Sequence, residues 1–169
     1  MLNNFTLEST RLKTRTLLEG DAERLYSIYS DKEAMKFRGS APMESLEDAQ
    51  NMIRNQTTIE NAIQKVRLGI VDKANAKLVG TLLFKFNKEV SNQCEIGYSF
   101  DKGEWNKGYG SETIKMTLDK LQKEEPINRV LAWCKKGNNA SIRILEKNGF
   151  VYEHQTEFSN SSLYIINLR

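Results

Sequence analysis

The sequence predicts an α/β fold in which a mixed, mostly antiparallel sheet carries helices on both faces. Runs of alternating apolar and polar residues, typical of half-buried strands, recur along the 169-residue chain. Several of these runs are joined by short polar connectors, as in antiparallel hairpins. Between Cys94 and Cys134, a strand-like run, a helix-like run and a second strand-like run follow one another, which is typical of a βαβ unit.

Length and composition favour one domain over residues 1–169, long enough to bury a core. The net charge of +3 is small and spread along the chain, so we expect no nucleic-acid partner. No apolar run approaches the ~20 residues of a membrane-spanning helix, so we expect no membrane partner. Residues 1–4 lack the pattern of a signal peptide. Cys94 and Cys134 are expected to be buried free thiols, which fits a cytoplasmic protein. Cys94 and Cys134 lack metal-ligand spacing and His154 is the only histidine, so we expect no metal site.

The first third of the chain alternates between strand-like and helix-like patterns. Residues 8–18 are predicted as a strand, and Asp21 as the cap of a helix whose apolar stripe includes Leu25 and Ile28. Residues 30–42 are expected to be irregular. Ser45, with Asp48 three residues later, is typical of a capped helix start, and we expect that helix to run to about Gln64. Its predicted buried face comprises Leu46, Ala49, Met52, Ile53 and Ile59.

The middle of the chain is predicted to form consecutive strands. Residues 66–71 and 78–86 form a predicted hairpin, and residues 94–100 the next strand. In that strand Cys94, Ile96, Tyr98 and Phe100 share one face, and Glu95, Gly97 and Ser99 share the other. A glycine inside a strand indicates a bulge or a close approach by a ligand, which singles out Gly97.

The last third is predicted to contain two helices and three strands. A helix over residues 113–123 ends at Pro126, and residues 129–134 form a buried strand. Asn138 caps a helix over residues 140–147, which Gly149 ends. The final strands are residues 150–158 and 163–168.

The stretch from Glu104 to Glu112 lies between a predicted strand and a predicted helix. The first N–H groups of a helix have no internal partner, and the helix dipole adds partial positive charge there. Gly108 and Gly110 remove side chains where an anionic ligand would approach the backbone. An ordinary turn before a helix is the alternative interpretation.

Four segments together resemble the GNAT acetyltransferases, and most of all the branch that acetylates the N-termini of ribosomal proteins. They are Trp105-Asn106-Lys107-Gly108-Tyr109-Gly110-Ser111-Glu112, residues 138–150, Glu95-Ile96-Gly97-Tyr98 and residues 7–12 with Arg15. The resemblance implies the acyl-CoA N-acyltransferase fold with splayed strands, acetyl-CoA as co-substrate and transfer of acetyl to an amine. There are two departures. Asn106 replaces the branch's usual glycine, and Leu145 stands where many members carry a tyrosine acid.

The resemblance also assigns residues to the cofactor. The backbone of residues 105–111 would hold the pyrophosphate, and Asn138 and Ser141 would lie at the pantetheine. Strand pairing with the pantetheine amides would use Tyr98, Ser99 and Phe100, provided that their strand splays from residues 129–134. The predicted cofactor-binding residues are Tyr98, Ser99, Phe100, Trp105, Asn106, Lys107, Gly108, Tyr109, Gly110, Ser111, Asn138 and Ser141.

Glu95 is the predicted general base, because an amine must lose a proton before it attacks the thioester. Glu146 and Glu157 are weaker candidates, and a solvated carboxylate is the alternative for Glu95. Ser141 is the predicted acid for the leaving thiolate, or else a second capping residue. A backbone N–H near Gly97 or Tyr98 would stabilise the oxyanion.

The acceptor side is assigned to residues 30–64, with Phe37 and Arg38 as predicted substrate-binding residues. The acceptor is a protein N-terminus or a small amine, and the sequence leaves open whether the chain forms a homodimer. No Cys–His signature is present, so direct attack is favoured over an acetyl-cysteine intermediate. A non-catalytic acyl-CoA-binding module is the main alternative. A Rossmann domain fits less well, because the first glycine of its fingerprint is missing.

Overall fold

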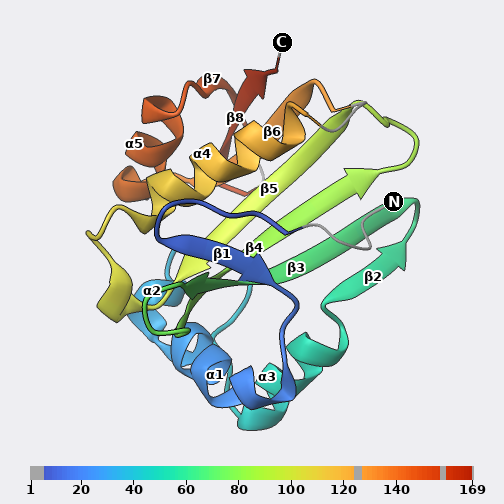
Figure 1. Cartoon of the computed structure of the whole chain (residues 1–169). Coiled ribbons are helices and arrows are strands. Elements are labelled where there is room, and N and C mark those ends of the chain that lie inside the picture. The colour runs from blue at the N-terminus through green and yellow to red at the C-terminus, as the bar shows by residue number, and fades with distance from the viewer. Residues whose placement is uncertain (1–5, 124–126, 157–158, 169) are drawn as a thin grey trace.

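A computed structural model describes residues 6–123, 127–156 and 159–168 of the chain (Figure 1). Its strands are β1 (Leu12–Arg15), β2 (Thr57–Glu60), β3 (Ile63–Asp72), β4 (Leu78–Asn87), β5 (Gln93–Phe100), β6 (Arg129–Lys135), β7 (Val151–Gln155) and β8 (Ser161–Asn167). Its α-helices are α1 (Ala22–Ser30), α2 (Lys32–Met35), α3 (Leu46–Arg54), α4 (Tyr109–Leu121) and α5 (Asn139–Lys147). Two short 3₁₀ turns, η1 (Glu19–Asp21) and η2 (Lys102–Glu104), precede α1 and the loop before α4.

The strands form one sheet in the order β1-β3-β4-β5-β6-β8-β7, with β2 paired to β3. Only β5 and β6 run parallel, and all other pairs among the described strands are antiparallel. A parallel pair needs a crossover, and α4 provides it. The predicted mixed, mostly antiparallel sheet is therefore confirmed.

The two faces of the sheet have different partners. On β4 and β5 the side chains of Leu82, Phe84 and Ile96 join the main core with Ile114 of α4, and we call this the α4 face. The alternate residues Thr81 and Ser99 point to the other side, where the Thr81 hydroxyl lies 2.6 Å from the Tyr29 hydroxyl of α1. We call this the Tyr29 face. Figure 1 shows α4 and α5 over the later strands, and α1, α2 and α3 grouped at another end of the sheet.

The predicted helix from Ser45 to about Gln64 is wrong in its second half. The capping box at Ser45 and Asp48 is present, but α3 ends at Arg54. Residues Thr57–Glu60 instead form β2, which pairs with the start of β3 through a turn at Asn61 and Ala62. Two β-branched threonines followed by Ile59 favour a strand over a helix. Leu46 and Ile59, predicted as buried, are 41% and 58% exposed.

The N-terminal third differs from the prediction in three other places. The predicted strand over residues 8–18 is limited to β1. Asp21 does not cap α1 through its side chain, which accepts hydrogen bonds from Arg15 and the Leu18 N–H instead. The segment expected to be irregular contains the short helix α2, because Asp31 accepts a hydrogen bond from the Ala34 N–H at 2.7 Å.

The second half follows the prediction more closely. The helix after the glycine-bearing loop begins four residues earlier than expected, at Tyr109. Asn138 caps α5 through a 3.2 Å bond from the Ser141 N–H, and Gly149 follows it with φ of +88°. The β4–β5 register runs through Gly97 without a bulge. Pro126, Glu157, Phe158 and residues 1–4 lie outside the described residues. In the described part of the chain, no helix has the length and apolar character needed to cross a membrane.

Candidate active site

The two central strands β5 and β6 separate partway along their length. Their parallel pairing runs from Gln93 opposite Arg129 to Ile96 opposite Ala132, and goes no further among the described residues. Residues 97–100 stay paired with β4, while β6 stays paired with β8 as far as Lys135. The strands therefore diverge at Gly97, and this divergence is the condition on which strand pairing with the pantetheine depends.

Helix α5 lies beside this divergence and contributes Ser141, while Asn138 is its N-cap residue. The Tyr98 and Ser141 hydroxyls form a 2.8 Å hydrogen bond between β5 and the first turn of α5. Asn138 bonds to the backbone N–H of Ser141, which leaves the Ser141 hydroxyl for other partners. Burial raises the pKa of the Tyr98 phenol, so it stays protonated at neutral pH. The structure thus brings two predicted residues together as a hydroxyl pair.

The acceptor-side segment also reaches the divergence. The Lys135 ammonium, at the end of β6, donates to the Arg38 carbonyl at 2.8 Å. The Arg38 guanidinium donates to the Phe100 carbonyl, at the end of β5, at 3.2 Å. An alanine methyl at Gly137 would lie 3.6 Å from the Phe37 ring. Phe37 and Arg38 therefore bridge the open ends of both strands.

Residues 105–108 form the α4 entry loop, which joins η2 to α4. Asn106 and Gly108 adopt left-handed conformations, with φ of +62° and +80°. Asparagine tolerates this region better than other residues with a side chain, which explains why it can stand at a usual glycine position. Alternating backbone conformations turn successive N–H groups toward a common point, where an anion can bind.

The hydrogen bonds of this loop leave donors free. None of the N–H groups of residues 106–111 donates to another described residue, whereas the Trp105 N–H donates to the Lys102 carbonyl at 3.3 Å. Trp105 is thus the one predicted backbone donor of the loop that is occupied by a described residue. Gly110 does not leave room for a ligand, because a methyl group there would lie 2.7 Å from the Ile144 side chain. It permits close packing of α4 on α5.

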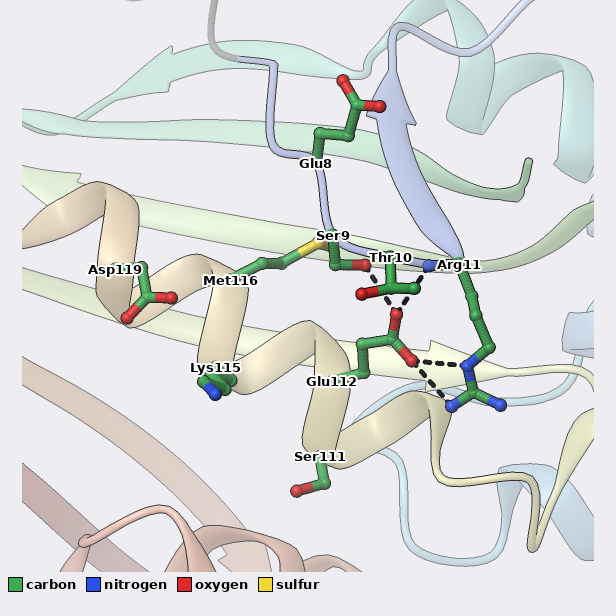
Figure 2. A pocket seen from close by; sticks show the side chains of 9 residues that line it. All are labelled: Glu8, Ser9, Thr10, Arg11, Ser111, Glu112, Lys115, Met116 and Asp119. Carbon is green, nitrogen blue, oxygen red and sulfur yellow. Dashed lines mark hydrogen bonds and ion pairs between the residues drawn. The ribbon is translucent and has the colours of Figure 1, made fainter.

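Arg11 stabilises the α4 entry loop by contacts with its backbone and with α4. Its guanidinium donates to the Lys107 carbonyl at 2.9 Å and lies 4.8 Å from the centroid of the Tyr109 ring. It also binds the Glu112 carboxylate, which accepts a further bond from the Ser9 hydroxyl (Figure 2). Burial raises the pKa of Glu112, but these hydrogen bonds outweigh it and leave the pKa below its ordinary value. The sequence did not indicate this role for Arg11.

The cavity of about 540 Å³ drawn in Figure 2 lies between this N-terminal segment and α4. Its lining residues are Glu8, Ser9, Thr10, Arg11, Ser111, Glu112, Lys115, Met116 and Asp119. None of them belongs to β5 or β6, so this cavity is distinct from the strand divergence.

Lys107 is held by a buried carboxylate. Its ammonium lies 2.7 Å from Glu104, which is 5% exposed and also binds Lys77 at 2.5 Å. The hydrogen bonds from Lys107 and Lys77 lower the pKa of Glu104. The main contact of Lys107 is therefore structural: through Glu104 and Lys77, it attaches the loop to the connection between β3 and β4.

Glu95 lies on the Tyr29 face, next to Gly97. Its Oε1 binds the Lys85 ammonium at 2.5 Å across the β4–β5 pair, and its side chain is 28% exposed. The carboxylate is thus paired with a neighbouring cation and remains accessible to an acceptor. The alternative Glu146 is exposed on α5.

Two other side chains at the divergence are unsuited to proton or acyl transfer. Leu145, at the usual tyrosine position, is 1% exposed and belongs to the main core. Burial raises the pKa of the Cys134 thiol, which disfavours the nucleophilic thiolate.

The sequence did not reveal a cationic cluster on the Tyr29 face. The Arg67 guanidinium donates to the Tyr29 hydroxyl at 2.9 Å, and that of Arg38 lies 4.7 Å from the Tyr29 ring centroid. Burial raises the pKa of Tyr29, but Arg67, Thr81 and Arg38 outweigh it and bring the pKa below its ordinary value. Groups whose pKa is shifted by specific charged partners are common in functional sites.

Comparison with known proteins decides the family. Residues 11–151 match the family described as "Acetyltransferase (GNAT) domain". The chain belongs to the GNAT family of acetyltransferases. Among related GNAT sequences, the uncharacterized N-acetyltransferase YoaA of Bacillus subtilis is 30% identical over 165 residues, covering 96% of this chain and 93% of that protein. The family assignment makes this chain an acetyltransferase and agrees with the observed fold.

Solved GNAT structures share this fold. An acetyltransferase of the GNAT family from Bacillus anthracis is 26% identical, with a TM-score of 0.81, covering 96% of this chain and 98% of that chain. Spermidine N-acetyltransferase from Vibrio cholerae, in complex with CoA and spermine, is 18% identical, with a TM-score of 0.78, covering 95% of this chain and 97% of that chain. The ribosomal L7/L12 alpha-N-protein acetyltransferase RimL, in complex with coenzyme A, is 17% identical, with a TM-score of 0.75, covering 96% of this chain and 98% of that chain. The last two proteins differ in acceptor, so this GNAT fold does not by itself specify one.

Proposed function

We propose that the chain transfers acetyl from acetyl-CoA to an amine by direct attack through a tetrahedral intermediate. The observation that carries this proposal is the end of β5–β6 pairing at Ile96 and Ala132, together with the free N–H groups of residues 106–111. The first feature supplies unpaired strand backbone for the pantetheine amides. The second supplies donors for the pyrophosphate, at the positive end of the α4 dipole.

The cofactor would lie across these two features. The N–H groups of residues 106–111 bind the pyrophosphate, and residues 98–100 of β5 pair with the pantetheine. Arg38 and Trp105 already donate to the Phe100 carbonyl, so the pairing relies on the other backbone groups of this segment. The thioester then lies near Gly97, where the strands diverge.

In the acyl step, the amine nitrogen forms a bond to the thioester carbonyl carbon, and the bond from that carbon to sulfur breaks. Glu95 takes the proton that the ammonium must lose before it attacks, since its carboxylate lies next to Gly97 and pairs with Lys85. Nitrogen loses a second proton when the tetrahedral intermediate collapses, which balances the proton given to the thiolate. A backbone N–H at Gly97 or Tyr98 stabilises the oxyanion.

The leaving thiolate needs a proton, and Leu145 has none to give. The Ser141 hydroxyl supplies it in this proposal, with the Tyr98 phenol as the next donor in line at 2.8 Å. Tyr98 on β5 thereby takes the place of the tyrosine that many GNAT members carry on the helix. The Ser141 hydroxyl is available as this proton donor because the cap of α5 uses only the backbone N–H of Ser141.

The sequence motifs favour the branch that acetylates ribosomal-protein N-termini, acting in the cytoplasm. A protein α-amine and a small amine both satisfy the chemistry just described. The buried Leu145 supports a second candidate, a non-catalytic acyl-CoA-binding module.

The deciding experiment combines thiol release from acetyl-CoA with mass detection of the product, over a panel of N-terminal peptides and small amines. Acetylated product in proportion to released thiol supports acetyl transfer. Tight CoA binding without turnover of any amine favours the non-catalytic module instead.

A further inference from the structure

The surface above Gly97 is open on the Tyr29 face. A methyl group built on Gly97 would find no atom within 4 Å. Glu95 and Ser99 flank this position on the same strand and the same face. An acceptor amine that approaches from this side meets the carboxylate of Glu95 next to the point where β5 and β6 diverge.

A cationic residue, Arg67, lies in the same row across the sheet as Gly97. Gly97 pairs with Leu83 of β4, and Leu83 pairs with Arg67 of β3, so the three residues form one row across the sheet. Neighbouring strands are about 4.8 Å apart, which puts the Arg67 backbone about 10 Å from Gly97. An arginine side chain and a small ligand together span that distance.

The Arg67 and Arg38 guanidiniums have neutral partners. Arg67 donates from Nη1 to the Tyr29 hydroxyl and, at 3.3 Å, to the Thr81 hydroxyl. Arg38 donates to the Ile28 and Phe100 carbonyls. Within the part of the chain that the structure describes, neither forms a salt bridge with a carboxylate, and Asp31 acts on Arg38 only through space.

Two partly buried cations beside one phenol are costly unless an anion joins them. Burial lowers the pKa of Arg38; Tyr29 opposes this shift, and the nearby Arg67 charge adds to it. A carboxylate suits this site, because a guanidinium binds its two oxygens through a planar pair of N–H donors. A polyamine does not, because its additional ammonium groups would face Arg67 and Lys85.

We infer that the acceptor is a small amine that also carries a carboxylate, such as an α-amino acid. Arg67, supported by Arg38, binds that carboxylate while the amine lies over Gly97 beside Glu95. This inference rests on the proposed acetyl transfer and narrows its acceptor class.

The test compares L-amino acids with their carboxamides, which differ only in the charged carboxylate, and includes spermidine as a polyamine. For each acceptor, kcat/KM is measured by thiol release from acetyl-CoA. The readout is the ratio of kcat/KM for acid over amide. Comparing this ratio between wild type and variants cancels the difference in amine pKa between the two acceptors.

In the wild type the ratio should favour the acid, and Arg67→Gln should reduce it by about tenfold or more, as expected for loss of a hydrogen bond to a charged group. Lys65→Gln is the matched control, because Lys65 lies two residues earlier on the same face of β3, 3.9 Å from the exposed Glu60. It should keep the wild-type ratio. Arg67→Lys is a second variant, in case Arg67→Gln does not fold. It keeps the positive charge but lacks the planar pair of N–H donors, so it should lower the ratio several-fold.

Each outcome decides between the proposals. A preference for carboxamides or spermidine, or an unchanged ratio in Arg67→Gln or Arg67→Lys, overturns the carboxylate inference and leaves acetyl transfer standing. An equal loss in Lys65→Gln also overturns it, because general charge would then explain the preference. If acetyl-CoA binds but no acceptor is acetylated, the proposed function fails and the inference fails with it.

Discussion

Arg11 and Glu112 join the start of the chain to the first turn of α4. The Arg11 Nε donates to Glu112 Oε2 at 2.7 Å, and the Arg11 backbone N–H donates to Oε1 at 2.9 Å. The same guanidinium holds the Lys107 carbonyl. The Lys107 carbonyl and the Gly108 N–H belong to one planar peptide and point in opposite directions. A carbonyl held by Arg11 therefore keeps this N–H directed away from Arg11, toward the proposed pyrophosphate.

Arg11→Gln should therefore weaken acetyl-CoA binding about tenfold, by loss of a charge-assisted hydrogen bond to the loop. The change should appear in KM for acetyl-CoA, with kcat little affected. S-acetylpantetheine lacks the pyrophosphate, so its kcat/KM should be the same for the variant and the wild type.

Lys73→Gln is the control for this prediction, because Lys73 forms an ion pair with Glu8 at 2.6 Å on the same N-terminal segment. It should leave both substrates unaffected. An equal loss with S-acetylpantetheine would show that Arg11 does not act through the pyrophosphate.

Gly108→Ala should destabilise the loop by about 1–2 kcal/mol, because residue 108 has φ of +80°. The dissociation constant of acetyl-CoA, measured by calorimetry, should rise in consequence. Gly20→Ala is the control, because a methyl group at Gly20 meets no atom within 4 Å and Gly20 is outside the left-handed region. Unchanged affinity in Gly108→Ala would argue against this loop as the anion site.

Glu95→Gln should lower kcat about a hundredfold and leave acetyl-CoA affinity nearly unchanged, since it removes the proposed base alone. The deficit should shrink above pH ~8 for an α-amine acceptor, because the amine then loses its proton unaided. Glu146→Gln, an exposed site on α5, should have no effect. Full activity in Glu95→Gln would remove Glu95 from the mechanism.

Ser141→Ala should also lower kcat about a hundredfold, through loss of the proposed proton donor. The cap of α5 uses the Ser141 backbone N–H, so the melting temperature should change little. Asn138→Ala, in contrast, removes the cap and should lower stability by about 1 kcal/mol. If Ser141→Ala loses stability but keeps its kcat, Ser141 has a structural role only.

Stability at acid pH should depend on Glu104. Hydrogen bonds from Lys107 and Lys77 lower its pKa in the folded chain below the ordinary 4.5, so its stabilising contribution is complete above that value. The contribution disappears as pH falls through the lowered folded-state pKa. Urea unfolding should therefore show Glu104→Gln to be less stable than the wild type at neutral pH, with a gap that narrows in acid. A constant gap would contradict this account.

Local patterns explain what the sequence predicted. Alternation located β4 and β5, and Asn138 and Gly149 located the ends of α5, because each signal depends only on neighbouring residues. The end of α3 was missed since a turn through Asn61 and Ala62, both at positive φ without glycine, has no strong local signal.

The candidate site could be proposed from the sequence only where it is local, and it stays a prediction. The α4 entry loop was proposed as an anion site from Gly108 and the helix that follows, whereas Gly110 serves close packing of α4 on α5. The Arg11–Glu112 pair spans 101 positions, and Arg67 reaches Tyr29 across 38. Contacts of that kind follow from strand register and helix packing, which one sequence does not specify residue by residue.

Backbone amide chemical shifts, followed by NMR during titration with acetyl-CoA, test the location of the site most directly. We predict that the largest changes occur at residues 97–100 and 106–111, that is, at the divergence of β5 and β6 and from the α4 entry loop into the first turn of α4. Largest changes confined instead to the cavity around Glu8, Lys115 and Asp119 would contradict it.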